Sequence, residues 1–150
     1  MEVYMFCRWR AVLYAFCLTV FAAITLAACS QPDSPAYHLA SLDALPPELR
    51  TQPTSVQEAY RFAIANPEIL KQVPCYCGCG SIGHTSNYQC YVLDENPNGI
   101  IQIDNHALGC SICVDITRDV MRMLDEGKSI PDIKAYVDST YSKYGPSNMP

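Results

Sequence analysis

The sequence has 150 residues, of which 10 are basic and 15 acidic, for a formal net charge of −5. This length suits one small folded domain, and the acidic excess argues against a nucleic-acid partner, because nucleic acids are bound by clustered Lys and Arg. The sequence shows no lipase-like Gly-x-Ser-x-Gly, phosphate-binding loop or paired carboxylates, so nothing indicates hydrolysis or favours an enzyme.

The N-terminal segment has the pattern of a secretion signal. Arg8 and Arg10 precede an uncharged apolar run, residues 11–26, which is shorter than the about 20 residues that a transmembrane helix needs. The run ends in Leu26-Ala27-Ala28-Cys29, which resembles the bacterial lipobox. We therefore expect removal of the signal peptide, residues 1–28, and lipidation of Cys29 by diacylglycerol and an acyl chain such as palmitate. The alternative is an uncleaved anchor helix with an incidental cysteine.

Cleavage would leave a chain with 8 basic and 14 acidic residues and a net charge of −6. This acidity keeps the domain away from anionic headgroups, so the lipid alone must hold the protein at the cell membrane, on its extracytoplasmic face. Residues 29–53 are rich in Pro, Ser, Asp and Ala and show no sustained period. They are predicted to form a flexible, lipidated tether.

A helical pattern begins at Thr54 and marks the start of the predicted domain. Thr54 and Ser55 offer caps, and apolar residues recur at helical spacing, which predicts a helix over about 55–65. Asn66-Pro67 ends this helix and can start a short one over 68–72, because Asn caps helices and Pro is tolerated in their first turn.

Two more helices are predicted near the C-terminus. The first has an apolar stripe over residues 112–124 and ends at Gly127, while Ser129 caps the second, whose stripe covers 130–144. We expect them to form an antiparallel helical hairpin packed beside the first helix. The predicted domain then covers residues 54–146.

The segment between the helices is irregular and rich in cysteine. Residues 88–93 and 100–103 look strand-like on either side of a turn-rich stretch, so a short β-hairpin is possible. The expected fold class is therefore mainly α: a small helical domain with a C-terminal hairpin and an irregular cysteine-rich segment.

The most informative stretch is Pro74-Cys75-Tyr76-Cys77-Gly78-Cys79-Gly80, which places three thiols within five residues. In an extended chain, alternate residues share one face with Cα atoms about 6.6 Å apart, which lies at the edge of disulfide geometry. Neighbouring thiols here are therefore not expected to bridge one another. One metal ion can span several of them, because metal–sulfur bonds are about 2.3 Å long, and Gly78 and Gly80 free the backbone to curl around it.

Further metal-ligand candidates lie downstream of this stretch. The core ligands are predicted to be Cys75, Cys77 and Cys79, and the rest are expected to come from Cys90, Cys110, Cys113, His84 and His106. Asp104 is a candidate hydrogen-bond partner for the histidines. Thiolate-rich sites favour Cu(I) or Zn(II). Export favours copper, with zinc the alternative, because an oxidising exterior threatens free thiols and a tightly bound ion would protect them.

Two other interpretations stay open. Six cysteines in an exported domain can form three disulfides, which would give a disulfide-stabilised domain that serves only to bind other molecules. Cys110-Ser111-Ile112-Cys113 is a C-x-x-C motif at a predicted helix start, where backbone N–H groups and the helix dipole lower thiol pKa values. Low-pKa thiolates serve metal binding and disulfide exchange alike. The partner of the domain is accordingly a metal ion and a metal-accepting protein, or a redox protein that reacts with Cys110 and Cys113.

Residues 74–80 read PCYCGCG, and the chain resembles the bacterial lipoproteins named for their PCYCGC motif. The resemblance extends over about 55–145 and includes Asp104-x-His106 and Cys110-x-x-Cys113. It implies an exported, membrane-anchored protein with a metal-binding cysteine motif. The hairpin after Cys110 is also similar to the C-x-x-C module of cytochrome c maturation thiol reductants, which lacks the PCYCGC trio.

Overall fold

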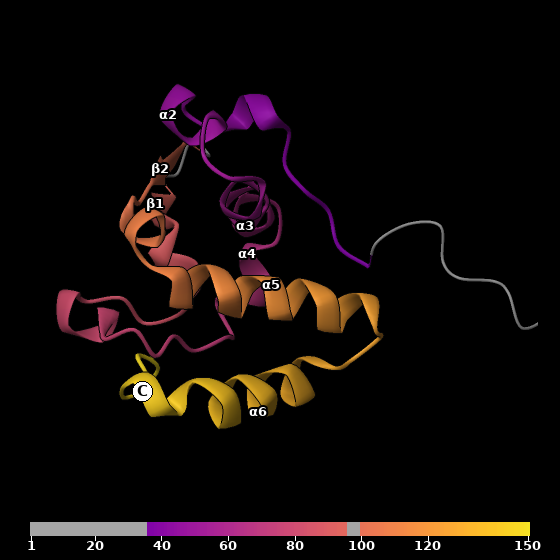
Figure 1. Ribbon diagram of the computed structural model, residues 1–150, viewed down its shortest axis with the longest axis vertical. Coiled ribbons are helices and arrows are strands. Elements are labelled where there is room, and N and C mark those ends of the chain that lie inside the picture. Colours follow the sequence, from indigo (N-terminus) through magenta and orange to yellow (C-terminus); the bar gives the residue numbers. More distant parts are fainter. Residues whose placement is uncertain (1–35, 96–99) are drawn as a thin grey trace, which may run out of the picture. The chain divides into compact units, whose positions relative to one another are not determined.

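A computed structural model of the protein describes residues 36–95 and 100–150 (Figure 1). The predicted signal peptide and the lipidation site at Cys29 lie outside these ranges. Within them, no helix combines the length and the apolar character needed to cross a membrane. All the described residues belong to one compact unit, which runs from Pro35 to Pro150.

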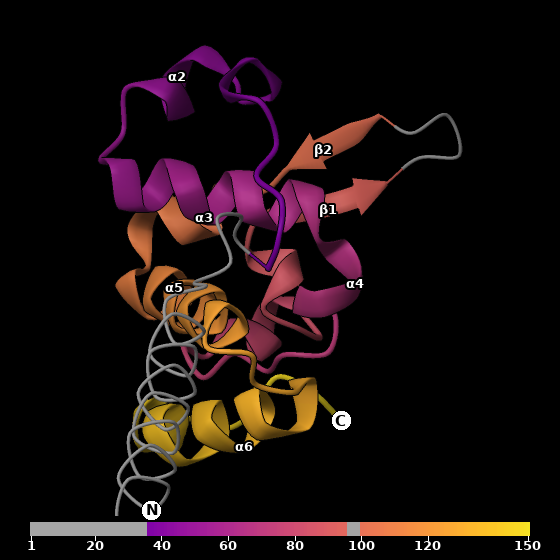
Figure 2. The ribbon, with the colours of Figure 1, turned by 90° about the vertical axis from the view of Figure 1, so that its right-hand side faces the viewer.

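Three helices form the frame of this unit: α3 (Thr54–Ala65), α5 (Ser111–Asp125) and α6 (Ile130–Tyr141). α3 packs against α5, and α6 lies beside α5 and runs in the opposite direction (Figures 1 and 2). The mainly α fold and the C-terminal antiparallel hairpin are therefore confirmed.

The α5–α6 hairpin follows from local sequence signals. Buried side chains recur at helical spacing along α5 from Cys113 to Met123, which gives the helix one apolar face. Gly127 has a left-handed φ of 72°, which few other residues adopt, and it turns the chain after α5. Ser129 then caps α6, and its hydroxyl accepts a hydrogen bond from the backbone N–H of Asp132 at 3.4 Å.

The structure differs from the sequence prediction over residues 36–53, which pack onto α3 instead of forming a tether. The short helix α2 (Pro47–Arg50) contributes Leu49, which is fully buried with Leu45. The backbone N–H of Ala40 donates to the carbonyl of Arg61 on α3 at 3.1 Å, and the Arg61 guanidinium donates back to the Ala40 carbonyl. Two well-spaced leucines thus order a segment whose Pro-rich composition suggested flexibility.

Two short elements lead into and out of the cysteine-rich segment. α4 (Pro67–Leu70) follows Asn66 as predicted, and β1 (Val92–Glu95) pairs antiparallel with β2 (Ile101–Ile103) in a small hairpin. β1 begins later than the predicted strand, because residues 88–90 form a single 3-10 turn, η4 (Tyr88–Cys90). The cysteine-rich segment lies beside the start of α5 and the end of α6 (Figure 1).

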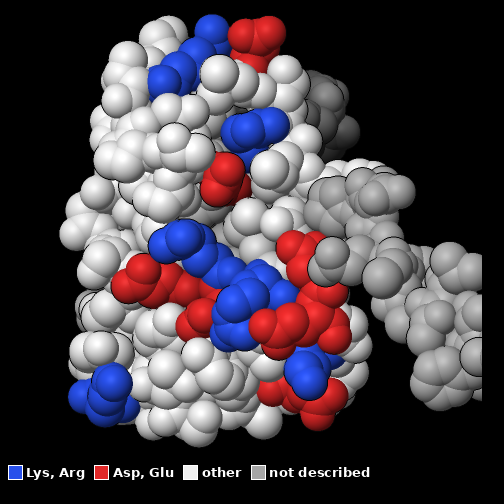
Figure 3. Space-filling model, turned by 45° about the vertical axis from the view of Figure 1, so that its right-hand side comes forward, with Lys and Arg blue, Asp and Glu red and all other residues white. Residues whose placement is uncertain are grey.

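Acidic and basic side chains are intermixed on the face that Figure 3 shows. On α5, Arg122 pairs with Asp119 at 3.0 Å and with Glu126 at 2.7 Å. Such exposed pairs contribute at most about 1 kcal/mol each to stability. Because this face carries no patch of one charge, it does not indicate a charged partner, and the candidate site lies among the cysteines.

Candidate metal centre

The PCYCGC segment, residues 74–79, turns sharply after its second cysteine. Gly78 has a left-handed φ of 86°, and the chain then enters the 3-10 turn η3 (Cys79–Ile82). Because of this turn, the Cys79 sulfur lies in the same group of close ligand atoms as the sulfurs of Cys75 and Cys77. Gly78 thus provides the backbone turn expected of it. Gly80 does not share this role: its φ is not positive, and a side chain there would meet Asn148 at 3.4 Å.

Three sulfur atoms form a close triangle at the start of α5. The Sγ atoms of Cys75 and Cys77 lie 3.4 Å apart, and Cys113 Sγ lies 3.6 Å from each of them. Cys75 and Cys113 are fully buried, and Cys77 is half-buried. The cysteine of the first helical turn of α5 therefore meets the first two cysteines of the PCYCGC segment.

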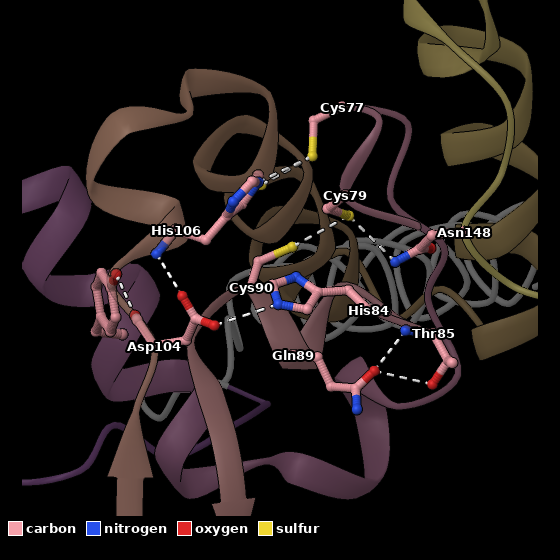
Figure 4. Close-up of polar contacts among 11 residues, drawn as sticks. Cys77, Cys79, His84, Thr85, Gln89, Cys90, Asp104, His106 and Asn148 are labelled. Carbon is pink, nitrogen blue, oxygen red and sulfur yellow. Dashed lines mark hydrogen bonds and ion pairs between the residues drawn. The ribbon is translucent and has the colours of Figure 1, made fainter. Parts of the chain in front are cut away.

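Three further donors surround this triangle. Cys90, at the end of η4, lies 3.7 Å from Cys79 between the two Sγ atoms. His106 opens the 3-10 turn η5 (His106–Gly109), and its Nε2 lies 3.4 Å from Cys77 Sγ (Figure 4). Five thiols and one imidazole from four separate chain segments therefore converge.

These six donors form two overlapping sets of four, in each of which all ligand atoms lie within 4.8 Å of one another. The first quartet consists of Cys75, Cys77, Cys79 and Cys90. The second quartet consists of Cys77, Cys90, His106 and Cys113. Both quartets contain the same pair, Cys77 and Cys90.

The donor spacings match metal coordination and not disulfide bonding. Four thiolates held at about 2.3 Å from one tetrahedral ion lie about 3.8 Å from one another, whereas a disulfide joins two sulfurs at about 2.05 Å. The shortest sulfur–sulfur separations here are 3.4 to 3.7 Å, and the six cysteines of the described chain are all free. The cluster can therefore hold a metal ion with little rearrangement, and no disulfide staple joins these cysteines.

In the metal-free cluster, the pKa values of some thiols are lowered and those of others are raised. A hydrogen bond with Cys113 lowers the pKa of Cys75, and the same contact raises the pKa of Cys113. Hydrogen bonding to Cys90 lowers the pKa of Cys77, while the pKa of Cys90 itself is raised, first by its contact with Cys113. Of these four thiols, Cys75 and Cys77 thus lose a proton most readily. A cation entering the cluster would replace the remaining protons and neutralise charge that is costly to bury.

Two predicted ligands, Cys110 and His84, belong to neither quartet. Cys110 is the N-cap residue of α5 and is half-buried; its thiol contacts those of Cys113 and Cys77 without completing either set of four. His84 is buried, and its Nε2 lies 3.2 Å from a carboxylate oxygen of Asp104 (Figure 4). Its ring packs edge-on against that of His106, with centroids 5.2 Å apart. His84 therefore lies next to the donors without joining them.

The expected low pKa at the helix start is wrong for the C-x-x-C pair. Burial raises the pKa of Cys110 and outweighs the backbone N–H of Cys113, which acts in the opposite direction. The pKa of Cys113 is raised as well, mainly by its hydrogen bond with Cys75. Disulfide exchange needs a low-pKa nucleophile, and neither thiol of this pair has a lowered pKa in the metal-free protein.

Asn148 ties the C-terminal tail to the cysteines, and sequence reasoning missed it by ending the domain at residue 146. Its Oδ1 accepts a hydrogen bond from the Cys75 backbone N–H at 2.7 Å, and its own N–H donates to the Cys75 carbonyl at 3.1 Å. Its Nδ2 also donates to Cys79 Sγ at 3.4 Å (Figure 4). No local sequence pattern in the tail predicts this role, because it depends on the tail packing back against the PCYCGC segment.

A buried polar network fixes the backbone at Cys113. The Cys113 carbonyl accepts hydrogen bonds from Tyr91 Oη at 2.8 Å and Asn87 Nδ2 at 3.4 Å. The single hydroxyl proton of Thr117 is donated to Asn87 Oδ1 at 2.7 Å, and Thr117 Oγ1 also lies 3.1 Å from the Cys113 carbonyl oxygen. Because all three side chains are buried, this network holds the Cys113 thiol in position.

Asp104 was predicted to be a hydrogen-bond partner of the histidines, and it contacts both. One oxygen accepts from the His106 backbone N–H at 2.6 Å, and the other lies against the His84 imidazole. The Asp104 carbonyl in turn accepts from Tyr60 Oη at 2.8 Å, which anchors the turn to α3. Asp104 therefore sets the position of the His106 backbone, and its contact with the His106 side chain is indirect.

The comparisons with known proteins agree with the cysteine pattern. The sequence model of a family described as "protein of unknown function with PCYCGC motif" matches residues 18–150, which is most of the chain. The protein belongs to the PCYCGC family. Searches of curated proteins and of solved structures gave no significant match. The PCYCGC family description names no activity, so a function for this chain has to be argued from its own donor cluster.

Proposed function

We propose that this protein binds a soft metal ion, Cu(I) or Zn(II), through its cysteine cluster, and buffers or delivers the ion at the extracytoplasmic face of the cell membrane. The observation that carries this proposal is the convergence of five thiols and one imidazole at spacings close to those of a metal coordination shell. Free thiols this close to one another are prone to oxidation outside the cytoplasm. A bound ion would keep them reduced and apart.

The donor set restricts the identity of the ion. Mg²⁺ and Ca²⁺ prefer oxygen ligands, whereas thiolate and imidazole suit Cu(I) and Zn(II). Asp104, the carboxylate beside the cluster, is already engaged by His84 and by the His106 backbone. Between the two soft ions we favour copper, because protection of clustered thiols matters most in an exported protein.

Exchange of the ion with a partner requires access from solvent. Cys77 and His106 of the cluster are only half-buried, as is the adjacent Cys110, while the other four thiols of the cluster are buried. An accepting protein can therefore approach one edge of the cluster. This arrangement suits buffering or delivery better than permanent structural retention.

The membrane location rests on the sequence alone and is part of the proposal. The segment Leu26-Ala27-Ala28-Cys29 resembles a lipobox, and the family match begins upstream of it, at residue 18. Lipidation of Cys29 would hold the acidic domain at the membrane. A Cys29→Ser variant should move from the membrane fraction to the soluble fraction, and unchanged membrane association would contradict the lipid anchor.

Native mass spectrometry of the exported domain, purified without added metal, tests the metal site. Bound copper or zinc with unmodified thiols is the expected result, and Cys77→Ser should abolish or strongly weaken loading. Cys110→Ser is the matched control, because Cys110 belongs to neither quartet and should leave loading intact. A metal-free protein that cannot be loaded after reduction, or a labile bridge confined to Cys110 and Cys113, would contradict the proposal.

A further inference from the structure

The cluster contains more donors than one ion uses. A tetrahedral ion takes four ligands, but five thiols and one imidazole converge here. If one ion occupied the first quartet, Cys113 and His106 would be left beside it. If it occupied the second quartet, Cys75 and Cys79 would be left. In both cases a buried thiol would touch bound thiolates without a cation of its own.

The two quartets form one continuous shell and are not two independent sites. They share Cys77 and Cys90, and together they use every one of the six donors. The remaining members also approach each other, since Cys75 of the first quartet lies 3.6 Å from Cys113 of the second between the Sγ atoms. Two ions placed in this shell would have to share thiolates.

We propose that the cluster binds two soft metal ions bridged by the thiolates of Cys77 and Cys90. This inference rests on the proposed metal-binding function and specifies its stoichiometry and its bridging ligands. Cys75 and Cys79 complete the first ion's ligands, and His106 and Cys113 complete those of the second. The thiol protons leave to solvent as the metal–sulfur bonds form, and no electron is transferred.

Charge and access support the sharing of these two thiolates. Deprotonation of five largely buried thiols would place several negative charges in the interior, which is costly without compensating cations. A second cation reduces this negative charge, and a bridging thiolate serves two ions at once. Cys90 belongs to both quartets and is fully buried, while Cys77, the other shared member, is half-buried. The first ion would therefore organise both bridging thiolates for the second, so loading should be cooperative.

Anaerobic titration of the reduced, folded domain with Cu(I), followed by native mass spectrometry, tests the stoichiometry. We expect the two-ion species to appear with little one-ion species, both in the parent protein and in Cys110→Ser. Cys79→Ser removes a non-bridging ligand of one ion and should stop at one ion, while Cys77→Ser should lose the two-ion species and weaken the remaining site. Saturation of the parent at one ion would overturn the dinuclear centre and leave the proposed function standing. Failure to bind any ion would overturn both.

A second measurement on the unaltered protein tests the bridge without relying on variants that fold poorly. After loading with ¹¹³Cd²⁺, two cadmium resonances are expected, each coupled to the β-protons of both Cys77 and Cys90. Two resonances coupled to separate sets of cysteines, or independent loading of two ions, would overturn the bridging role of these two residues.

Discussion

Replacement of Asn148 by alanine should weaken both the fold around the cysteines and the metal affinity. Its Oδ1 accepts from the Cys75 backbone N–H at 2.7 Å, and its Nδ2 donates to Cys79 Sγ at 3.4 Å. Asn148→Ala removes both side-chain contacts and keeps the backbone bond from residue 148 to the Cys75 carbonyl. The variant therefore isolates the side chain's part in fixing the PCYCGC segment.

The expected cost follows from the burial of Cys75. A buried N–H group left without an acceptor costs about 1–3 kcal/mol, and the weaker contact to sulfur adds little to that. For a domain of roughly 100 residues, about 2 kcal/mol corresponds to a fall in Tm of about 8–16 °C. Loss of a hydrogen bond to a metal-ligating group typically lowers metal affinity about 10–100-fold.

Asn148→Asp separates the two effects. The carboxylate keeps an oxygen for the Cys75 N–H, so the metal-free variant should stay within about 1 kcal/mol of the parent. It loses the donor to Cys79 and places a negative charge beside a ligand thiolate, so its metal affinity should fall. Urea denaturation of the metal-free proteins and competition with a chromophoric chelator measure the two quantities. An alanine variant as stable as the parent, or an aspartate variant with parental affinity, would refute the role given to this side chain.

Three further changes have expected outcomes. Gly145→Ala places a Cβ 3.0 Å from the Tyr76 carbonyl oxygen, so thermal denaturation should show a loss of about 1–3 kcal/mol in the free energy of unfolding. In the control variant Gly109→Ala, the new Cβ points into open space and the loss should be less than about 0.5 kcal/mol. Equal losses in the two variants would contradict the close packing of the tail against Tyr76. Thr117→Val keeps the side-chain shape but leaves the buried Asn87 Oδ1 without its hydroxyl donor, so urea denaturation should show a loss of about 1–3 kcal/mol, and an unchanged midpoint would exclude the network as a stabilising feature. Removal of the metal from the loaded protein by a chelator should lower stability by about 4 kcal/mol at a free metal concentration 1,000 times Kd, and an unaltered Tm would mean that the ion does not bind the folded cluster.

The helical hairpin was predictable from the sequence because its signals are local. The apolar face of α5, the left-handed Gly127 and the Ser129 cap lie within or next to the elements that they define. The start of the folded unit was not predictable in this way. Leu45 and Leu49 are buried only because α3 offers them a surface, and composition alone does not reveal that contact.

The candidate site was predictable in its residue types and only partly in its membership. The sequence indicated a pool of thiols and imidazoles, and six of its eight members converge. The other two lie beside the quartets: the half-buried Cys110, at the start of α5, contacts Cys113 and Cys77 without belonging to either quartet, and His84 is engaged by Asp104. Asn148 was missed because its contacts join residues more than 60 positions apart.

X-ray absorption spectroscopy of the metal-loaded domain identifies the atoms that bind the ion. We expect a first shell dominated by sulfur at about 2.3 Å, with a minor nitrogen contribution from one imidazole. A shell of oxygen and nitrogen without sulfur, or a protein that retains no metal after gel filtration, would contradict metal binding by the cysteine cluster.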